Sequence, residues 1–201
     1  YFAVGKFGFE AGVMITASHN PAQYNGLKIC KKDAIPLSGD EGLNQMLDLV
    51  NQGKLKASPT KGAIKSRDID SDYISHCLSF VDPKKIWGYK IAVDAGNGMA
   101  GRTVPPIFRQ LPGTLVPMFF DLDGTFPNHP ASPIEPENIA ALQETVVREH
   151  CDFGAAFDGD ADRMFLVDEK GRALAGSDVA ALVSKVLLKK NPGAAILYNA
   201  I

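Results

Sequence analysis

An acidic turn lies between two short apolar runs in the segment Phe153-Gly154-Ala155-Ala156-Phe157-Asp158-Gly159-Asp160-Ala161-Asp162-Arg163-Met164-Phe165-Leu166-Val167-Asp168. The runs at residues 153–157 and 163–168 predict two strands joined by that turn. Outward from them, strand-like runs alternate with helical patterns along the whole chain. This alternation predicts an α/β fold, with mixed-sheet three-layer α/β domains.

The other expected strands are residues 12–16, 27–30, 90–94, 115–120 and 195–198. One helix is expected to start at a capping box formed by Ser38 and Glu41 and to end at Gly53. Three more helices are expected from apolar residues at helical spacing, in residues 74–81, 139–146 and 179–187. A polar, lysine-rich connection covers residues 54–68, and a new unit is expected from Ile69 onward.

Composition excludes several classes of protein. The 201 residues carry 21 basic and 23 acidic side chains, so the balanced charge gives no electrostatic case for binding nucleic acid. No apolar run reaches the length of a membrane span, and the N-terminus does not resemble a targeting peptide. The three cysteines are far apart and lack metal-type spacing, which indicates reduced thiols and a cytoplasmic protein.

The acidic turn is the strongest chemical signal. Asp158, Asp160 and Asp162 alternate with small residues, so the three carboxylates can turn together toward one hard cation, Mg²⁺ or Ca²⁺. The alternative is a solvated acidic turn that binds nothing. A calcium loop of the EF-hand kind is rejected, because Arg163 stands where that loop needs glycine and the flanking runs are strand-like rather than helical.

A second signal follows the first expected strand, where Ser18 stands in the segment Thr16-Ala17-Ser18-His19-Asn20-Pro21. A serine at a strand exit, with backbone donors around it, suits a phosphate group. Lys28, a few residues later, offers either charge for a phosphate or a group for proton transfer. The alternative is an ordinary turn held by Asn and Ser hydrogen bonds.

Gly96, Gly98 and Gly101 have the spacing of a dinucleotide-binding turn. Pro105 and Pro106 are expected to interrupt the helix that such a site requires. We therefore interpret these glycines as tight strand-to-helix packing. The histidines at positions 76, 129 and 150 are expected to be structural.

In this order, the serine loop, the glycine turn and the acidic turn resemble those of the α-D-phosphohexomutase family. The resemblance implies that Ser18 carries a phosphoryl group and shares a Mg²⁺ ion with Asp158, Asp160 and Asp162. It further implies that Arg163 contacts phosphate. His19 would line the phosphoserine, and Lys28 is a candidate for proton transfer at a sugar hydroxyl.

The implied reaction interconverts a hexose 1-phosphate and a hexose 6-phosphate, of mannose or glucose, through a hexose 1,6-bisphosphate. The family's chain has four domains. The resemblance assigns residues 1–68 to the later part of the first domain, 69–171 to the second, and 172–201 to the start of the third. A fragment of this kind is expected to show little mutase turnover.

Two rival functions are kept. One is a non-catalytic module that binds Mg²⁺ and sugar phosphates, in which Ser18 never carries phosphate. The other is a metal-dependent phosphatase with an aspartyl nucleophile at Asp158 or Asp160. The phosphatase is disfavoured because no separate acidic pair follows downstream.

Overall fold

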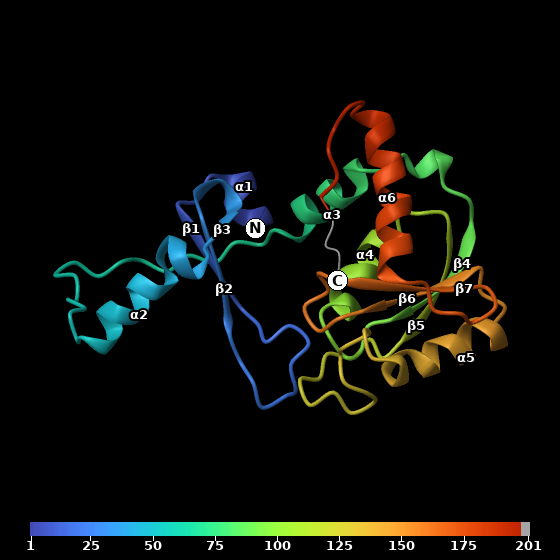
Figure 1. The fold of residues 1–201 in the computed structure, drawn as a ribbon, viewed down its shortest axis with the longest axis horizontal. Helices are drawn as coiled ribbons and strands as arrows, with labels where there is room; N and C mark the ends of the chain where they lie inside the picture. The colour runs from blue at the N-terminus through green and yellow to red at the C-terminus, as the bar shows by residue number, and fades with distance from the viewer. Residues whose placement is uncertain (198–201) are drawn as a thin grey trace. The chain divides into compact units, whose positions relative to one another are not determined.

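The computed structural model describes residues 1–197. Contacts group these residues into two units (Figure 1). The first unit contains Tyr1–Ala17 and Tyr24–Asp82, and the second contains Ser18–Gln23 together with the chain from Pro83 onward. The loop that carries Ser18 therefore belongs to the second unit, although both of its neighbours in sequence belong to the first.

The first unit is built on an antiparallel sheet of three strands. Its order is β1-β2-β3, with β1 at Ala11–Ile15, β2 at Leu27–Lys31 and β3 at Ile35–Pro36. Helix α1 (Phe2–Phe7) buries Val4. Gly12 on β1 makes room for this side chain, since a Cβ there would lie 2.6 Å from Val4 Cγ2. The two expected strands of this segment are confirmed.

The expected helix at 38–53 is confirmed only in part. A distorted turn, η2 (Gly39–Leu43), precedes α2 (Asn44–Asn51). The predicted capping box is wrong, because the Ser38 side chain makes no capping hydrogen bond. Gly42 has a φ of 151°, and this non-helical residue breaks the regular geometry of the first turn.

Helix α3 (Asp70–Ser79) ends the first unit and packs by its aromatic side. The His76 ring lies 5.0 Å from the ring of Phe2 and 4.9 Å from that of Phe80, measured between centroids. Phe2 also makes an edge contact with Tyr73. His76 is therefore part of a packed aromatic cluster, as a structural histidine should be.

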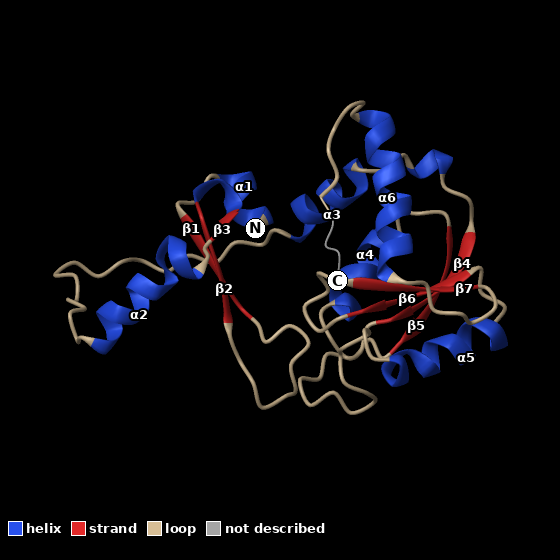
Figure 2. Ribbon diagram, viewed as in Figure 1, coloured by secondary structure: helices blue, strands red, loops and turns tan. Residues whose placement is uncertain are grey.

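The second unit contains a mixed sheet of four strands in the order β5-β4-β6-β7 (Figure 2). The strands are β4 (Tyr89–Asp94), β5 (Gly113–Met118), β6 (Phe153–Phe157) and β7 (Met164–Asp168). Strand β4 runs parallel to β5 and β6, whereas β7 is antiparallel to β6. The strand expected at 115–120 ends early, because Phe119 adopts a left-handed conformation with a φ of 54°.

Helices cover both faces of this sheet, with α5 (Ala140–Arg148) on one side and α4 (Ala100–Phe108) on the other (Figure 2). Leu142 and Val146 on α5 are fully buried. Gly154 on β6 lies directly beneath them, since a Cβ there would be 2.6 Å from Val146 Cγ2. These layers confirm the predicted three-layer α/β architecture.

The remaining elements are the long helix α6 and three short turns of 3₁₀ helix. Their bounds are α6 (Gly176–Lys190), η1 (Lys32–Ala34), η3 (Pro83–Lys85) and η4 (Pro136–Ile139). Over the described residues, no helix combines the length and apolar character needed to cross a lipid bilayer. All three cysteines are free thiols, in agreement with the prediction.

Two further expectations need correction. Pro105 and Pro106 do not interrupt a helix but lie inside α4. Proline fixes φ near the helical value, so the helix loses two backbone donors there without having to end. The strand expected at 195–198 is not formed over residues 195–197, and Tyr198 lies outside the described residues. A strand needs a hydrogen-bonded neighbour, and residues 195–197 have none in the described sheets.

Candidate functional site

Ser18 lies in the loop that follows β1, and its backbone is left-handed with a φ of 56°. Positive φ is uncommon for a residue other than glycine, and such strain concentrates at functional sites. The loop belongs by its contacts to the second unit.

Asp158 comes directly after β6 and anchors the acidic turn. Its side chain is fully buried. Its Oδ1 accepts the backbone N–H groups of Asp162 and Arg163, each at 3.1 Å. Its carbonyl oxygen accepts the N–H of Ala161 at 3.0 Å, which closes the turn. These two donors to its Oδ1 hold the buried carboxylate in position and stabilise its negative charge.

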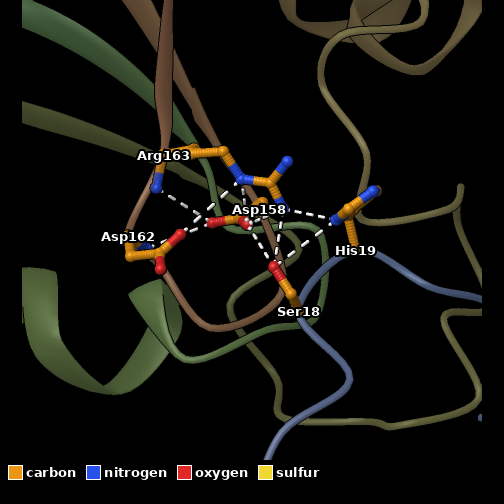
Figure 3. A network of polar contacts seen from close by, with 5 residues as sticks. All are labelled: Ser18, His19, Asp158, Asp162 and Arg163. Carbon is orange, nitrogen blue, oxygen red and sulfur yellow. Dashed lines mark hydrogen bonds and ion pairs between the residues drawn. The ribbon is translucent and has the colours of Figure 1, made fainter. Parts of the chain in front are cut away.

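Ser18, Asp158 and Arg163 form one polar network (Figure 3). The Ser18 hydroxyl donates to Asp158 Oδ2 at 3.1 Å, and Arg163 Nη2 donates to Ser18 Oγ at 2.6 Å. Arg163 also holds Asp158 Oδ2 through Nε at 2.8 Å and Nη2 at 2.6 Å. The guanidinium therefore places a positive charge beside the serine oxygen and the buried carboxylate together.

His19 extends this network on its exposed side. Its Nδ1 lies 3.4 Å from Ser18 Oγ and also contacts Arg163 Nη2. Because a guanidinium can only donate, Nδ1 accepts and the ring proton is on Nε2. The sequence-predicted residues Ser18, His19, Asp158 and Arg163 are thus brought together.

Close backbone packing holds the serine loop against the acidic turn. A Cβ on Gly159 would lie 2.3 Å from the carbonyl oxygen of Ser18, and one on Gly98 would lie 2.6 Å from that of Gly159. The Met99 N–H donates to the same Gly159 carbonyl at 2.9 Å. The glycine turn therefore packs tightly, as predicted, and what it packs against is the acidic turn.

The acidic turn has the donor set of a hard-cation site. Asp158, Asp160 and Asp162 each offer an oxygen, and these oxygens lie within 4.8 Å of one another. Their exposure rises in that order from buried to exposed, so the site opens to solvent on one side. Oxygen ligands at this spacing fit Mg²⁺. The flanking elements are the strands β6 and β7, which supports the rejection of an EF-hand.

Sequence comparison identifies the family. The family model described as phosphoglucomutase/phosphomannomutase, alpha/beta/alpha domain II, matches residues 71–171, and that of domain I matches residues 1–56. The chain belongs to the phosphoglucomutase/phosphomannomutase family.

Relatives in this family align with nearly the whole of the chain. A protein named phosphohexose mutases from Xanthomonas campestris is 38% identical over 99% of the chain, and a phosphomannomutase from Vibrio cholerae is 34% identical over the same share. The chain spans 44% of the length of each. A crystal structure of a phosphoglucomutase/phosphomannomutase family protein from Burkholderia thailandensis covers 92% of this chain and 39% of its own, with a TM-score of 0.83 and 31% identity.

Lys28 belongs to a different part of this mutase-family chain. It lies on β2 in the first unit, opposite Met14 on β1, and is half-buried. The residues of the polar network all belong to the second unit. Its role in proton transfer therefore stays a prediction.

Sequence reasoning missed one pair of residues near the site. His129 Nε2 lies 3.0 Å from Oδ2 of Asp94, a carboxylate that is buried at the end of β4. The hydrogen bond to Asp94 raises the pKa of His129, although burial partly opposes the shift. A signal was present, since Asp94 ends a strand in the same glycine turn. The 35 residues that separate the pair concealed its partner.

Proposed function

We propose that this chain is the phosphoserine-carrying and metal-binding part of a phosphohexomutase, an intramolecular phosphotransferase of the isomerase class. Its substrates would be mannose or glucose 1-phosphate and 6-phosphate, with a hexose 1,6-bisphosphate as intermediate. The observation that carries the proposal is the contact of Ser18 Oγ with Asp158 Oδ2 at 3.1 Å, beside the Arg163 guanidinium that bonds both. The relatives named phosphomannomutase and phosphohexose mutases support it.

In this proposal Ser18 Oγ is both phosphoryl donor and acceptor. A sugar hydroxyl attacks the phosphorus of phosphoserine, the P–Oγ bond breaks, and a new P–O bond to the sugar forms. The hydroxyl proton passes to a base, for which Lys28 is the candidate, and the departing Ser18 Oγ takes up a proton from water, so the serine hydroxyl is restored. The other phosphoryl group of the resulting bisphosphate then returns to Ser18 by the reverse steps.

Arg163 supplies charge where phosphoryl transfer needs it. Its guanidinium already donates to Ser18 Oγ, so it is positioned to contact a phosphoryl group on that oxygen. Ser18, Asp158, Asp160 and Asp162 would hold Mg²⁺, which when bound neutralises the oxygens of the transferred group. His19 would line the phosphoserine.

The division into domains remains part of the proposal. Residues 1–68 would form the later part of the first domain, 69–171 the second, and 172–201 the start of the third. The family models for domain I and domain II match residues 1–56 and 71–171, which is in keeping with this division.

A phosphorylation experiment tests the function. The chain is incubated with Mg²⁺ and glucose or mannose 1,6-bisphosphate, and intact mass and peptide mapping then locate any phosphate. We expect one phosphoryl group on Ser18, none in Ser18→Ala, and full labelling in Ser58→Ala, a matched change in the exposed connection of the first unit. A chain that carries no phosphate contradicts the proposal and favours a binding module. A labile acyl phosphate on Asp158 or Asp160 contradicts it as well and favours the phosphatase.

A further inference from the structure

A second charged pair lies beneath the site. The side chains of Asp94 and His129 are 1% and 15% exposed, and Nε2 of the ring is 3.0 Å from Oδ2 of the carboxylate. The other ring nitrogen, Nδ1, is 2.9 Å from the carbonyl oxygen of Pro130. Both partners are acceptors, so a ring that satisfies both must donate from both nitrogens, and only imidazolium does so.

The Asp94–His129 pair fixes the glycine turn from below. Asp94 Oδ1 accepts the N–H of Gly96 at 2.8 Å, so the same carboxylate holds both the turn and the imidazolium. Gly96 is left-handed with a φ of 51°, and a Cβ there would lie 3.5 Å from His129 Cε1. The N–H of Asn97 donates to Phe119 at 2.8 Å, which ties the other side of the turn to the end of β5.

The other side of the glycine turn contacts the acidic turn. Met99 donates to the Gly159 carbonyl at 2.9 Å, and Gly159 in turn packs against the carbonyl of Ser18. Ala131, two residues after His129, lies under the same contact, because a Cβ on Gly159 would be 3.6 Å from its Cβ. An unbroken series of contacts therefore leads from the imidazole to the serine loop.

We infer that the ion pair of His129 with Asp94 is a positioning device for the active site. Protonated His129 fixes the glycine turn. The glycine turn, through Met99 and Gly159, holds Ser18 and the acidic turn at the spacing that binds a cation. The inference rests on the proposed function, in which the acidic turn is the metal site. The hydrogen bonds of His129 go to Asp94 and Pro130, neither of which is a proposed metal ligand, so His129 is a positioning residue that acts through Asp94.

This arrangement makes the site sensitive to pH. Among the described residues, Asp94 is the charged group that faces the ring, and Phe119, Gly96 and Pro130 are its uncharged neighbours. The bond to Asp94 raises the pKa of His129 above its ordinary value, so the ring keeps its second proton to a higher pH than an ordinary histidine does. Above that pKa the ring loses one of its two donors, and the support of the turn weakens.

The test follows His129 and the metal site in the same protein. Nitrogen-15 NMR of the imidazole gives the pKa of His129, and calorimetric titration with Mg²⁺ alone gives the Kd between pH 6 and 9. We expect the Kd to rise with a midpoint at the His129 pKa. In the metal-free chain, the amide signals of Met99 and Gly159 should shift with that same midpoint.

A variant separates charge from hydrogen bonding. His129→Gln keeps a donor for Asp94 but has no charge, and we expect Mg²⁺ binding that no longer changes with pH. Removing a partner that holds a metal ligand directly costs about 10- to 100-fold in affinity, and His129 acts one layer further out, so we expect a weakening of about threefold to tenfold. His150→Asn is the control, because His150 is exposed and left-handed and asparagine tolerates that conformation.

Each outcome decides. A Kd that stays constant through the His129 pKa, a neutral ring at pH 6, or unchanged pH dependence in His129→Gln would overturn the inference. If His129→Gln does not fold, the wild-type midpoints still decide. Absence of Mg²⁺ binding at every pH would overturn the metal site together with this inference, whereas pH-independent binding would overturn the inference alone.

Discussion

The hydroxyl oxygen of Ser18 lies 3.1 Å from Oδ2 of Asp158, although 140 positions separate the two residues in sequence. Asp158 is buried and its side chain accepts two backbone N–H groups, so it gives the serine a rigid partner. Arg163 contacts both. A serine hydroxyl beside a carboxylate of a candidate hard-cation site is the arrangement that the proposed phosphoryl transfer requires.

Gly159→Ala should damage the site while leaving the sheet intact. The added Cβ would lie 2.3 Å from the Ser18 carbonyl oxygen, so the serine loop must move away from the acidic turn. A misplacement of about 1 Å can reduce a reaction rate by about 100-fold. We expect a loss of that order in the rate of Ser18 phosphorylation from a hexose bisphosphate, followed by mass spectrometry.

Gly124→Ala is the matched control, because nothing lies within 4 Å of its added Cβ. This change should leave the phosphorylation rate as it is in the unmodified chain. Equal rates in Gly159→Ala and Gly124→Ala would show that the backbone contact does not position Ser18.

Asp160→Asn should have opposite effects on stability with and without metal. In EDTA, removing one of three clustered carboxylates relieves their mutual repulsion, so the unfolding temperature should rise. In Mg²⁺, the loss of a ligand should weaken binding by about tenfold or more and lower the metal-induced gain in unfolding temperature. Thermal unfolding under both conditions measures the two effects. Asp48→Asn on α2 is the charge control, and a change of the same sign under both conditions would contradict a metal site.

Gly154→Ala should destabilise the core of the second unit. Its Cβ would lie 2.6 Å from Val146 Cγ2 and 2.9 Å from Leu142 Cδ1, and overpacking of this kind costs about 1–3 kcal/mol. Val146→Ala makes space, so the double variant should lose less stability than the sum of the single losses. Urea unfolding of the four chains completes the cycle, with an expected coupling of about 1 kcal/mol. Additive losses would mean that the two residues do not compete for the same space.

The turn after β7 should lose stability in acid. Asp168 accepts the side-chain Nε–H of Arg172 at 2.7 Å and the backbone N–H groups of Arg172 and Lys170. These bonds lower the pKa of Asp168, with the Arg172 side chain as the largest cause. A lowered folded pKa gives stability that is present above the ordinary aspartate value, about 3.9, and is lost as the pH falls through the folded value.

Asp168→Asn removes this contribution. Its unfolding temperature should lie below that of the unmodified chain at pH 6, and the difference should shrink as the pH falls below about 4. A difference that stays constant down to pH 2.5 would assign the effect to packing rather than to the charge of Asp168.

Sequence patterns predicted the elements whose evidence is local. The runs at 153–157 and 163–168 form β6 and β7, as predicted. Short apolar runs on both sides of a turn are typical of buried strands, so this evidence lies within the segment itself. The distortion in the first turn after Ser38 was not predicted, because the Ser38 and Glu41 spacing favours a regular helix start and gives no sign of the φ of 151° at Gly42. Helix α4 was missed because two prolines argue against a helix unless tertiary packing supports it.

The site was predictable to the same extent. Residue types alone left Ser18 and the acidic triplet open between a functional site and ordinary turns. The order of the serine loop, the glycine turn and the acidic turn, which resembles that of a known family, predicted the chemistry. The pairing of His129 with Asp94 had no such motif, and it depends on how a proline-rich loop returns to the end of β4. Contacts of this kind are set by the fold and not by neighbours in sequence.

The assignment of Ser18–Gln23 to the second unit has a mechanical consequence. The chain crosses between the units at three peptide bonds, after Ala17, Gln23 and Asp82. A rotation of the first unit about these crossings would leave the Ser18 hydroxyl and the Asp158 carboxylate together in the second unit. The spacing between Ser18 and Asp158 is therefore set inside one unit and does not depend on the orientation of the other.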